Sequence, residues 1–330
     1  MTTARAAPAP GPLARAAAQL FWAVGAPAGL VWAALSLALL PFYPAACLAS
    51  LALIAALAAV PVDTPPPNFL ARALPALFRA PYDFHRVRLV FQDRAALDTA
   101  RPHLVAFEPH GVLPTGAAAL SLFPAAPLPA GLRGALIGVS SAIFAVPLAR
   151  HLLWWAGCRP ASPAALRATL AGGTSVVLCP SGVREAMLSQ AAAARGGEAV
   201  FLRQRAGFVR LALEQGAPLV PVFAFGQSRA FFFLRPFIDV PRAGVEGPPP
   251  WWQGVVRRIG VVPLVGLPRW RVPITIVVGR PLEAPPGVER AAPTEAQVAA
   301  HLAAFIAALR ALFEEHKAAA GYPDERLVVL

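Results

Sequence analysis

A long stretch near the N-terminus carries no charge. From Ala16 to Val62 there is no Asp, Glu, Lys or Arg. A helix that crosses a bilayer needs about 20 apolar residues, and this stretch holds two such runs, at about 18–40 and 44–61. The runs meet at Pro41-Phe42-Tyr43-Pro44, where two nearby prolines break a continuous helix. The pattern therefore predicts a transmembrane helical hairpin over residues 16–62.

Basic residues flank the outer ends of this predicted hairpin. Arg5 and Arg15 precede it, Arg72 and Arg79 follow it, and the hinge carries no charge. Basic residues favour the cytosolic side of a membrane, so both termini are expected to be cytosolic. A signal peptide is the alternative, but its apolar region is shorter, about 7–15 residues, and a cleavage site follows it. A re-entrant anchor fits the pattern as well as a spanning hairpin does.

Beyond residue 80, short apolar runs alternate with helical patterns. Ser162-Pro163 is suited to begin a helix, and Thr294-Glu-Ala-Gln297 is a capping box at the start of a longer one. The run Ser140–Trp155 is interrupted by Pro147 and by two basic residues, which indicates a buried or interfacial helix rather than a third span. Strands alternating with helices predict an α/β sheet covered on both faces. The predicted strands are Val87–Phe91, His103–Phe107, Ala135–Val139, Ser175–Cys179, Leu219–Phe225 and Ile274–Val278, and the predicted helices are 163–171, Phe201–Gln215 and 295–318.

The same pattern divides the chain into four segments. Residues 1–15 are rich in Ala and Pro and are predicted to be disordered. The membrane hairpin occupies 16–62, and residues 63–80, which include three consecutive prolines, are predicted to be a linker. Residues 81–330 then form the α/β domain, which is long enough to bury its own core.

Composition narrows the choice of partners. Hydrophobic residues make up 57% of the chain, which indicates that some apolar surface meets a lipid bilayer. The net charge of +12 favours anionic partners such as headgroups or a phosphorylated ligand. No nucleic-acid-binding fingerprint occurs, so no nucleic acid partner is expected. The widely spaced Cys47, Cys158 and Cys179 make neither a disulfide framework nor a zinc site, and no metal is expected.

Candidate chemistry lies at Phe107-Glu108-Pro109-His110-Gly111. The proline ends the preceding strand and disfavours helix at Glu108, so the chain turns sharply there. Gly111 lets the backbone approach a ligand closely. Because imidazole titrates near neutrality, His110 on such a turn can act as a general base. From these residues alone, a surface turn without a catalytic role is an equally good interpretation.

Four motif blocks carry a more specific signal than this turn alone. In their order and spacing they resemble the type-2 diacylglycerol acyltransferase family. The plant and algal branch fits best, because Glu108 stands where animal members have a histidine. The resemblance runs from about Val87 to Leu330, and the uncharged stretch lies where that family keeps its membrane anchor. The blocks are Glu108–Pro114, Pro180–Glu185, Arg205–Arg210 with Gly216–Val222 and Phe225–Gln227, and Ala320–Asp324.

This resemblance implies a glycerolipid-acyltransferase-like mixed sheet with flanking helices. It implies an enzyme of the endoplasmic reticulum membrane, with contact to lipid droplets, that moves an acyl group from acyl-CoA to diacylglycerol and forms triacylglycerol. Acyl-CoA is then a co-substrate and no cofactor is expected. The sequence leaves open whether the protein forms a homo-oligomer.

Residue by residue, His110 matches the essential histidine of that family. Two departures stand out: Ser181 replaces the middle glycine of the second block, and Tyr82-Asp83-Phe84 only approximates an upstream Tyr-Phe-Pro signature. The candidate substrate-binding residues are Gly111, Pro180, Ser181, Gly182, Arg205, Gly207 and Phe208.

Ester formation from a thioester requires an activated hydroxyl and a place for the oxyanion. A neutral His110 can take the hydroxyl proton, an effect worth roughly 10²–10⁴-fold in rate. Its other ring nitrogen needs an acceptor, for which Glu185 is the stronger candidate, while Glu108 is interpreted mainly as a turn residue. Backbone N–H groups near Gly111 or around Ser181-Gly182 are candidates for holding the oxyanion.

Several alternatives remain open at this point. Arg205 or Arg210 is expected to meet the phosphates of CoA, with Arg203 and Arg184 as further candidates. Monoacylglycerol or a long-chain alcohol can replace diacylglycerol as acceptor, since acceptor choice depends on pocket shape. A serine lipase or esterase using Ser228 is a remote alternative, because Gly226-Gln-Ser-Arg-Ala230 follows an apolar strand. A non-catalytic membrane scaffold is the last alternative.

Overall fold

A computed structural model describes residues 31–111, 113–182, 197–234, 265–269 and 272–330, together with positions 11 and 29. Within them lies a seven-stranded mixed sheet with strand order β1-β10-β7-β2-β5-β3-β4, which confirms the predicted α/β class. All neighbours pair in parallel except β10 and β7, which are antiparallel. The strands are β1 (Arg88–Phe91), β2 (Leu104–Glu108), β3 (Leu136–Val139), β4 (Cys158–Pro160), β5 (Val176–Leu178), β7 (Leu219–Phe225) and β10 (Thr275–Val278).

The central strands β2 and β7 are buried along their whole length. They pair in register from Leu104 opposite Leu219 to Glu108 opposite Phe223. Their continuous apolar runs suit a strand that is covered on both faces. Side chains alternate between two cores: Leu104 packs in one, and Val105 in the other. This alternation confirms that helices cover both faces of the sheet.

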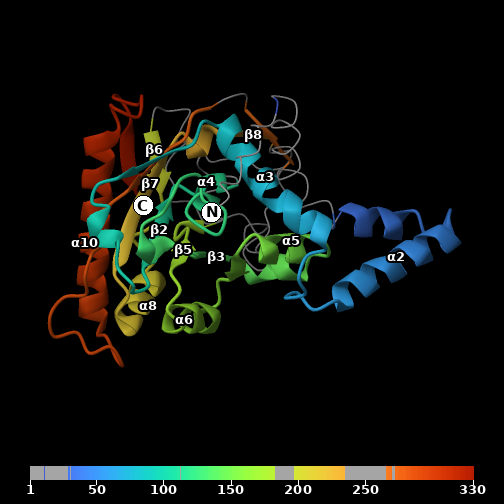
Figure 1. The fold of residues 1–330 in the computed structure, drawn as a ribbon, viewed down its shortest axis with the longest axis horizontal. Coiled ribbons are helices and arrows are strands. Elements are labelled where there is room, and N and C mark those ends of the chain that lie inside the picture. Colours follow the sequence, from blue (N-terminus) through green and yellow to red (C-terminus); the bar gives the residue numbers. More distant parts are fainter. Residues whose placement is uncertain are drawn as a thin grey trace, which may run out of the picture.

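One face is covered by α6 (Pro163–Ala171), α8 (Gly207–Gln215) and α10 (Glu295–His316), and the other by α3 (Asn68–Phe84) (Figure 1). The capping box at Thr294 and the cap at Ser162 form as predicted. Among the described residues, α10 is the one helix long and apolar enough to cross a membrane. Its Phe305 and Phe313 are fully buried against the sheet, so here it serves as a core helix.

Shorter elements complete the fold. Two small sheets pair β6 (Gly197–Val200) in parallel with β11 (Arg326–Val329), and β8 (Phe231–Leu234) antiparallel to β9 (Val265–Pro268). The predicted helix over Ser140–Trp155 is split at Pro147 into η3 and α5, as expected for a residue that cannot continue a helix. The remaining short helices are α4 (Thr115–Ala118), α5 (Ala149–Trp155), η1 (Ala95–Leu97), η2 (Ala130–Leu132), η3 (Ser141–Ala145) and η4 (Gln227–Arg229).

Two boundaries differ from the sequence-based expectation. The segment 63–80, predicted as a linker, contains the start of α3, because the proline run ends at Pro67 and the apolar Leu74 and Phe78 that follow lie four residues apart and pack on the sheet. The helix predicted over Phe201–Gln215 begins only at Gly207. The backbone N–H groups of Leu202 and Arg203 both donate instead to the carbonyl oxygen of Leu330, which holds this stretch beside the end of the chain.

Part of the predicted hairpin over 16–62 lies outside the described residues, as does the predicted disordered segment 1–15 apart from Gly11. In the described part, residues 31–38 are helical and α2 (Pro44–Ala59) follows. The two helices touch through Ser50, whose Oγ accepts a hydrogen bond from Trp32 Nε1 at 2.8 Å and lies 2.9 Å from Ser36 Oγ. This pair extends away from the α/β domain (Figure 1).

Candidate active site

Three neighbouring strands end at one edge of the sheet. β5, β2 and β7 lie side by side and run parallel, so their carboxyl ends meet there. The segments that follow them are 109–114, 179–182 and 226–230. In open α/β sheets the carboxyl ends of the strands are the usual place for a ligand. The predicted residues Glu108, His110 and Ser181 therefore lie at one edge, although they come from separate parts of the chain.

His110 lies two residues beyond the end of β2, after a cis peptide bond between Glu108 and Pro109. Its imidazole is half-buried, and Nδ1 lies 2.7 Å from the carbonyl oxygen of Gly111. Because a carbonyl can only accept, this hydrogen bond assigns the proton to Nδ1 and leaves Nε2 as an acceptor. Burial lowers the pKa of His110 below its ordinary value, against the opposing effect of the hydrogen bond to Gly111. A neutral histidine with an accepting Nε2 has the form that a general base requires.

The acceptor that the structure describes for His110 is a main-chain group. A carboxylate is the predicted acceptor, and Nδ1 lies in hydrogen-bond distance of the carbonyl oxygen of Gly111. Glu185 lies outside the described residues, so its predicted role is not addressed by this geometry. Glu108 directs its Oε1 to Ser181. A main-chain carbonyl can fix a histidine tautomer just as a carboxylate can.

Glu108 is not the simple turn residue that its sequence position suggests. Its side chain is 0% exposed, and Oε1 accepts hydrogen bonds from Ser181 N at 2.9 Å and Ser181 Oγ at 2.7 Å. The same hydroxyl oxygen accepts from Phe201 N at 2.9 Å. A buried carboxylate is tolerated only when such donors replace water. Ser181 therefore joins the ends of β2 and β5 to the segment that precedes α8.

The predicted oxyanion donors of the second block are already engaged. Ser181 N donates to Glu108, and Gly182 N donates to the carbonyl oxygen of Cys179 at 3.1 Å. Gly182 has a φ of +59°, and among the described residues, its chain neighbours aside, no atom lies within 4 Å of the position that a Cβ would occupy. These two N–H groups therefore point away from a ligand at this edge, although the described part of the chain does not fill the space at the Gly182 Cα.

The third block is divided between the edge and the core. Arg205 is exposed and lies just before α8. The C-terminus of α8 is followed closely by the start of β7, so the N-terminus of α8 lies at the edge where β7 ends, which is the edge that carries His110. Gly207, the first residue of α8, is exposed there as well. Phe208 instead packs on Phe305 of α10, with ring centroids 5.2 Å apart. The ring of Phe208 thus faces the core, and its contact with substrate stays a prediction.

The other candidate arginines have partners. Arg210 bonds Glu295 and the carbonyl oxygen of Pro293, and Arg203 donates from Nε to the carbonyl oxygen of Val329 at 3.1 Å. Arg184 lies outside the described residues. Among the residues that the structure describes, no such side-chain partner is found for Arg205. Of the candidate arginines described here, it is thus the one best placed to meet an anionic ligand at this edge.

Ser228 and Gln227 follow the end of β7. Ser228 Oγ bonds the buried carboxyl group of Glu198, and not a histidine, which argues against a serine hydrolase triad. Gln227, whose individual role was not foreseen, bonds Leu113 O in the loop that follows His110 and Gly116 N in α4. The sequence did place Phe225-Gly-Gln227 in a motif block. A polar residue directly after the apolar run Leu219–Phe225 was the signal that could have indicated a role for Gln227.

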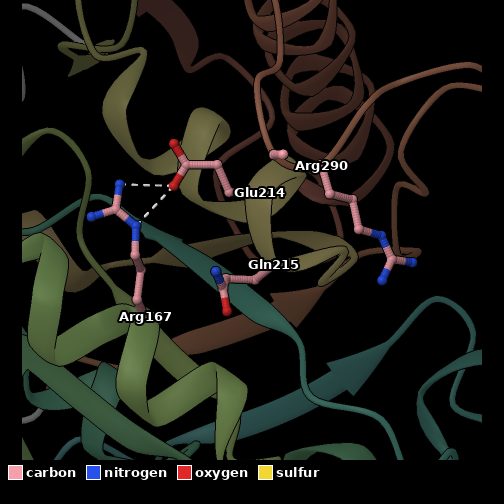
Figure 2. A pocket seen from close by; sticks show the side chains of 5 residues that line it. Arg167, Glu214, Gln215 and Arg290 are labelled. Atoms are coloured by element: carbon pink, nitrogen blue, oxygen red, sulfur yellow. Dashed lines mark hydrogen bonds and ion pairs between the residues drawn. The ribbon is translucent and has the colours of Figure 1, made fainter.

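A pocket of about 370 Å³ lies elsewhere on the domain. Arg167 of α6 faces Glu214 near the end of α8 across it, at 2.8 Å between Nη2 and Oε2 (Figure 2). Gln215 and Arg290 line it as well. Since Glu214 comes shortly before the start of β7, this pocket lies at the opposite edge from His110. In the described part of the chain no group of three or more His, Cys, Asp or Glu is placed to hold a metal ion.

Comparison with known proteins agrees with this arrangement. The family model described as "Diacylglycerol acyltransferase" matches residues 74–330. The chain is 33% identical to 2-acylglycerol O-acyltransferase 3 of Homo sapiens, covering 75% of this chain and 73% of that protein. It is 30% identical to diacylglycerol O-acyltransferase 2-like protein 6 of Homo sapiens (67% and 68% covered) and 27% identical to diacylglycerol O-acyltransferase 2 of Danio rerio (75% and 69% covered).

A solved structure also matches, that of a 1-acyl-sn-glycerophosphate acyltransferase from Thermotoga maritima. The match has 10% sequence identity and a TM-score of 0.43, and covers 87% of this chain and 96% of that one. This score is too low to bear on the site. The family match spans most of the chain and includes all four motif blocks. The chain therefore belongs to the diacylglycerol acyltransferase family.

Proposed function

We propose that this protein is a membrane-bound acyl-CoA:diacylglycerol O-acyltransferase that forms triacylglycerol. The proposal rests above all on His110, a neutral histidine whose Nδ1 is bonded to Gly111 and whose Nε2 is left to accept a proton. Its position where three parallel strands end, within a chain of this family, supports the assignment. Acyl-CoA is the co-substrate, and no cofactor takes part.

In the proposed reaction, the acceptor hydroxyl attacks the thioester carbonyl carbon while His110 Nε2 takes the hydroxyl proton. The tetrahedral intermediate then collapses, the carbon–sulfur bond breaks, and CoA leaves as a thiolate. The thiolate receives the proton from the imidazolium, so that an ester and free CoA form and His110 returns to its neutral state. General base catalysis of this kind contributes roughly 10²–10⁴-fold.

Arg205 is the proposed contact for the CoA phosphates. It is exposed at the active-site edge, one residue before the N-cap of α8. The N-terminus of a helix favours anions, and an arginine beside it adds a bidentate donor. Gly182, whose Cα has no described atom beyond its chain neighbours within 4 Å of a Cβ position, is proposed to lie against the substrate at the same edge.

The membrane anchor is proposed to lie in residues 16–62. Phe42 and Tyr43, at the turn before α2, are 74% and 64% exposed. The 16 residues of α2 span about 24 Å at 1.5 Å each, less than the roughly 30 Å of a bilayer core. This length favours an anchor that enters and leaves by the cytosolic face of the endoplasmic reticulum. Protease protection in sealed microsomes tests the orientation, because the N-terminus and the α/β domain must be digested together if both lie on the cytosolic side.

Monoacylglycerol is the second candidate acceptor. It is favoured by the higher identity to 2-acylglycerol O-acyltransferase 3 (33%) than to diacylglycerol O-acyltransferase 2 of Danio rerio (27%). The two reactions share the attack on a thioester and differ in the pocket that holds the acceptor.

The test is expression in a yeast strain that lacks neutral-lipid synthesis, followed by lipid analysis. Membranes from this strain are also assayed with radiolabelled oleoyl-CoA and diacylglycerol, 2-monoacylglycerol or hexadecanol. Triacylglycerol formed by the wild-type protein, and none by His110→Ala at a matched protein level, is the expected result. Wax ester as the sole product would identify a long-chain alcohol as the acceptor, and diacylglycerol as the sole product would identify monoacylglycerol. Near wild-type turnover by His110→Ala would remove the histidine from the mechanism.

A further inference from the structure

Gln227 reaches from the end of β7 into the loop that follows His110. Its side chain is 1% exposed. Oε1 accepts from Gly116 N at 3.0 Å, and Nε2 donates to the carbonyl oxygen of Leu113 at 2.8 Å. Both amide atoms are thus used, one on Leu113 before α4 and the other on Gly116 in the first turn of α4. A single side chain therefore sets the path of this loop at two points.

Two glycines leave the space that this contact needs. A Cβ on Gly116 would lie 2.9 Å from Gln227 Oε1 and 2.8 Å from the Phe107 ring. A Cβ on Gly111 would lie 3.1 Å from the carbonyl oxygen of Gln227, and Gly111 has a φ of +61°. The main chain of Gln227 therefore lies against Gly111, whose carbonyl oxygen orients His110, while the side chain holds the loop beyond it.

Gln227 is itself held firmly from behind. Gly226 has a φ of +86°, and a Cβ there would lie 2.2 Å from the carbonyl oxygen of Pro273. The next two residues are anchored as well: Ser228 bonds Glu198, and Arg229 forms an ion pair with the buried Glu325. Because the backbone around Gln227 is held in place, its side chain can hold Leu113 and Gly116 in fixed positions.

We propose that Gln227 is a positioning residue that places His110 for proton transfer. This inference rests on the proposed function, since it assigns a role relative to the general base. Gln227 does not touch substrate. Its side chain holds the backbone at Leu113 and Gly116, its main chain lies against Gly111, and together these contacts set the direction of His110 Nε2. A displacement of about 1 Å at a reacting group can cost about 10²-fold in rate. The effect is thus expected in kcat rather than in the binding of acyl-CoA.

Two substitutions separate positioning from packing. Gln227→Leu keeps a similar volume and removes both hydrogen bonds. Gln227→Glu keeps the acceptor for Gly116 N, and its protonated form also supplies a donor for Leu113 O. Because burial raises the pKa of a carboxyl group, this form is populated within the range of an activity assay. The matched control is Gln92→Leu, which loses one hydrogen bond to Glu315 at the opposite edge of the sheet.

The experiment measures kcat and KM for oleoyl-CoA in membranes between pH 5.5 and 8, together with the melting temperature of each purified variant. For Gln227→Leu we expect kcat to fall roughly 10–100-fold, with KM changed less than about twofold. For Gln227→Glu, the ratio of its kcat to that of the wild type should rise as the pH falls. Gln92→Leu should match the wild type in both constants.

Three outcomes would overturn the inference while leaving acyl transfer by the wild type intact. In the first, Gln227→Leu folds and keeps the kcat of Gln92→Leu. In the second, its KM rises while kcat is unchanged. In the third, which applies even if Gln227→Leu fails to fold, Gln227→Glu melts like the wild type yet shows the same reduced ratio at every pH. Absence of acyl transfer by the wild type would instead refute the proposed function itself.

Discussion

Removal of the Ser181 hydroxyl should destabilise the fold far more than the loss of one ordinary serine. Ser181→Ala deletes a donor to the buried carboxylate of Glu108 and an acceptor for the N–H of Phe201. A hydrogen bond to a charged group is worth about 1.5–3 kcal/mol, and depriving a buried N–H of its acceptor costs about 1–3 kcal/mol. Since Ser181 N still donates to Glu108, we expect a total of about 3–5 kcal/mol.

Ser121→Ala is a suitable control for this change. Ser121 is equally buried, but its hydroxyl makes a single local bond to the carbonyl oxygen of Ala118 at 2.9 Å. Its loss should cost about 1 kcal/mol. For a chain of this size a change of 1 kcal/mol shifts the melting temperature by about 2 °C, so Ser181→Ala should melt about 6–10 °C below the wild type.

Melting in detergent is followed by tryptophan fluorescence, with all variants purified in the same way. A double variant adds a second check: once Glu108→Gln has removed the charge, Ser181→Ala should cost less than it does alone, because the charged bond no longer exists. If Ser181→Ala melts within 2 °C of Ser121→Ala, or if the two changes are additive, the hydroxyl does not support the carboxylate and the reasoning fails.

Further predictions concern pH, the two carboxylates and a helix cap. Burial lowers the pKa of His110 below about 6.5, so the acid limb of the kcat/KM profile should fall below that pH; an acid limb above pH 7 would contradict a neutral buried base. Burial also raises the pKa of Glu198 to about 7, above its value of about 4.3 in an unfolded chain. The protonated carboxyl group therefore favours the folded state at low pH, and this contribution to stability is lost as the pH rises from about 4 to about 7. Glu198→Gln should therefore flatten the melting temperature across this range, and an unchanged slope would assign the pH dependence to other groups. Glu185→Gln should lower acyl transfer strongly if its carboxylate assists His110, whereas Glu108→Gln should retain substantial turnover. An inactive Glu108→Gln beside an active Glu185→Gln in the oleoyl-CoA assay would exchange the roles of the two carboxylates. Thr294→Ala removes the capping box of α10 and should cost about 1 kcal/mol, visible as a lower melting temperature with unchanged kcat.

The central strands and the helix caps could be predicted because the information for them is local. Leu219–Phe225 is a continuous apolar run, and Thr294 lies three residues from Gln297, with which it forms the capping box. Pro-rich stretches misled the prediction at α3. Pro75 and Pro81 lie inside this helix, where the apolar stripe packed on the sheet outweighs their cost.

The site was predictable only in part, for a related reason. His110 stands out because the turn around it is encoded by its own neighbours. The burial of Glu108 depends on Ser181, which is 73 positions away and reaches it only because β5 pairs with β2. Gln227 meets its two partners across 111 and 114 positions. No local pattern in the sequence predicts contacts of this range. Phe208 shows that a residue within a motif block can also pack in the core.

The order of the strands has a consequence for synthesis. β1 is the first strand of the sheet to leave the ribosome, yet it lies at the edge, and the strand it pairs with is β10, the last one made. The uncharged helices around Ser50 emerge before either of them. With the proposed anchor in the bilayer, the nascent chain is held at the membrane before the partner of its first strand has been made. Contacts of such long separation form slowly and leave strand edges exposed meanwhile. A ribosome stalled before Thr275 should therefore hold a membrane-bound chain to which chaperones stay attached.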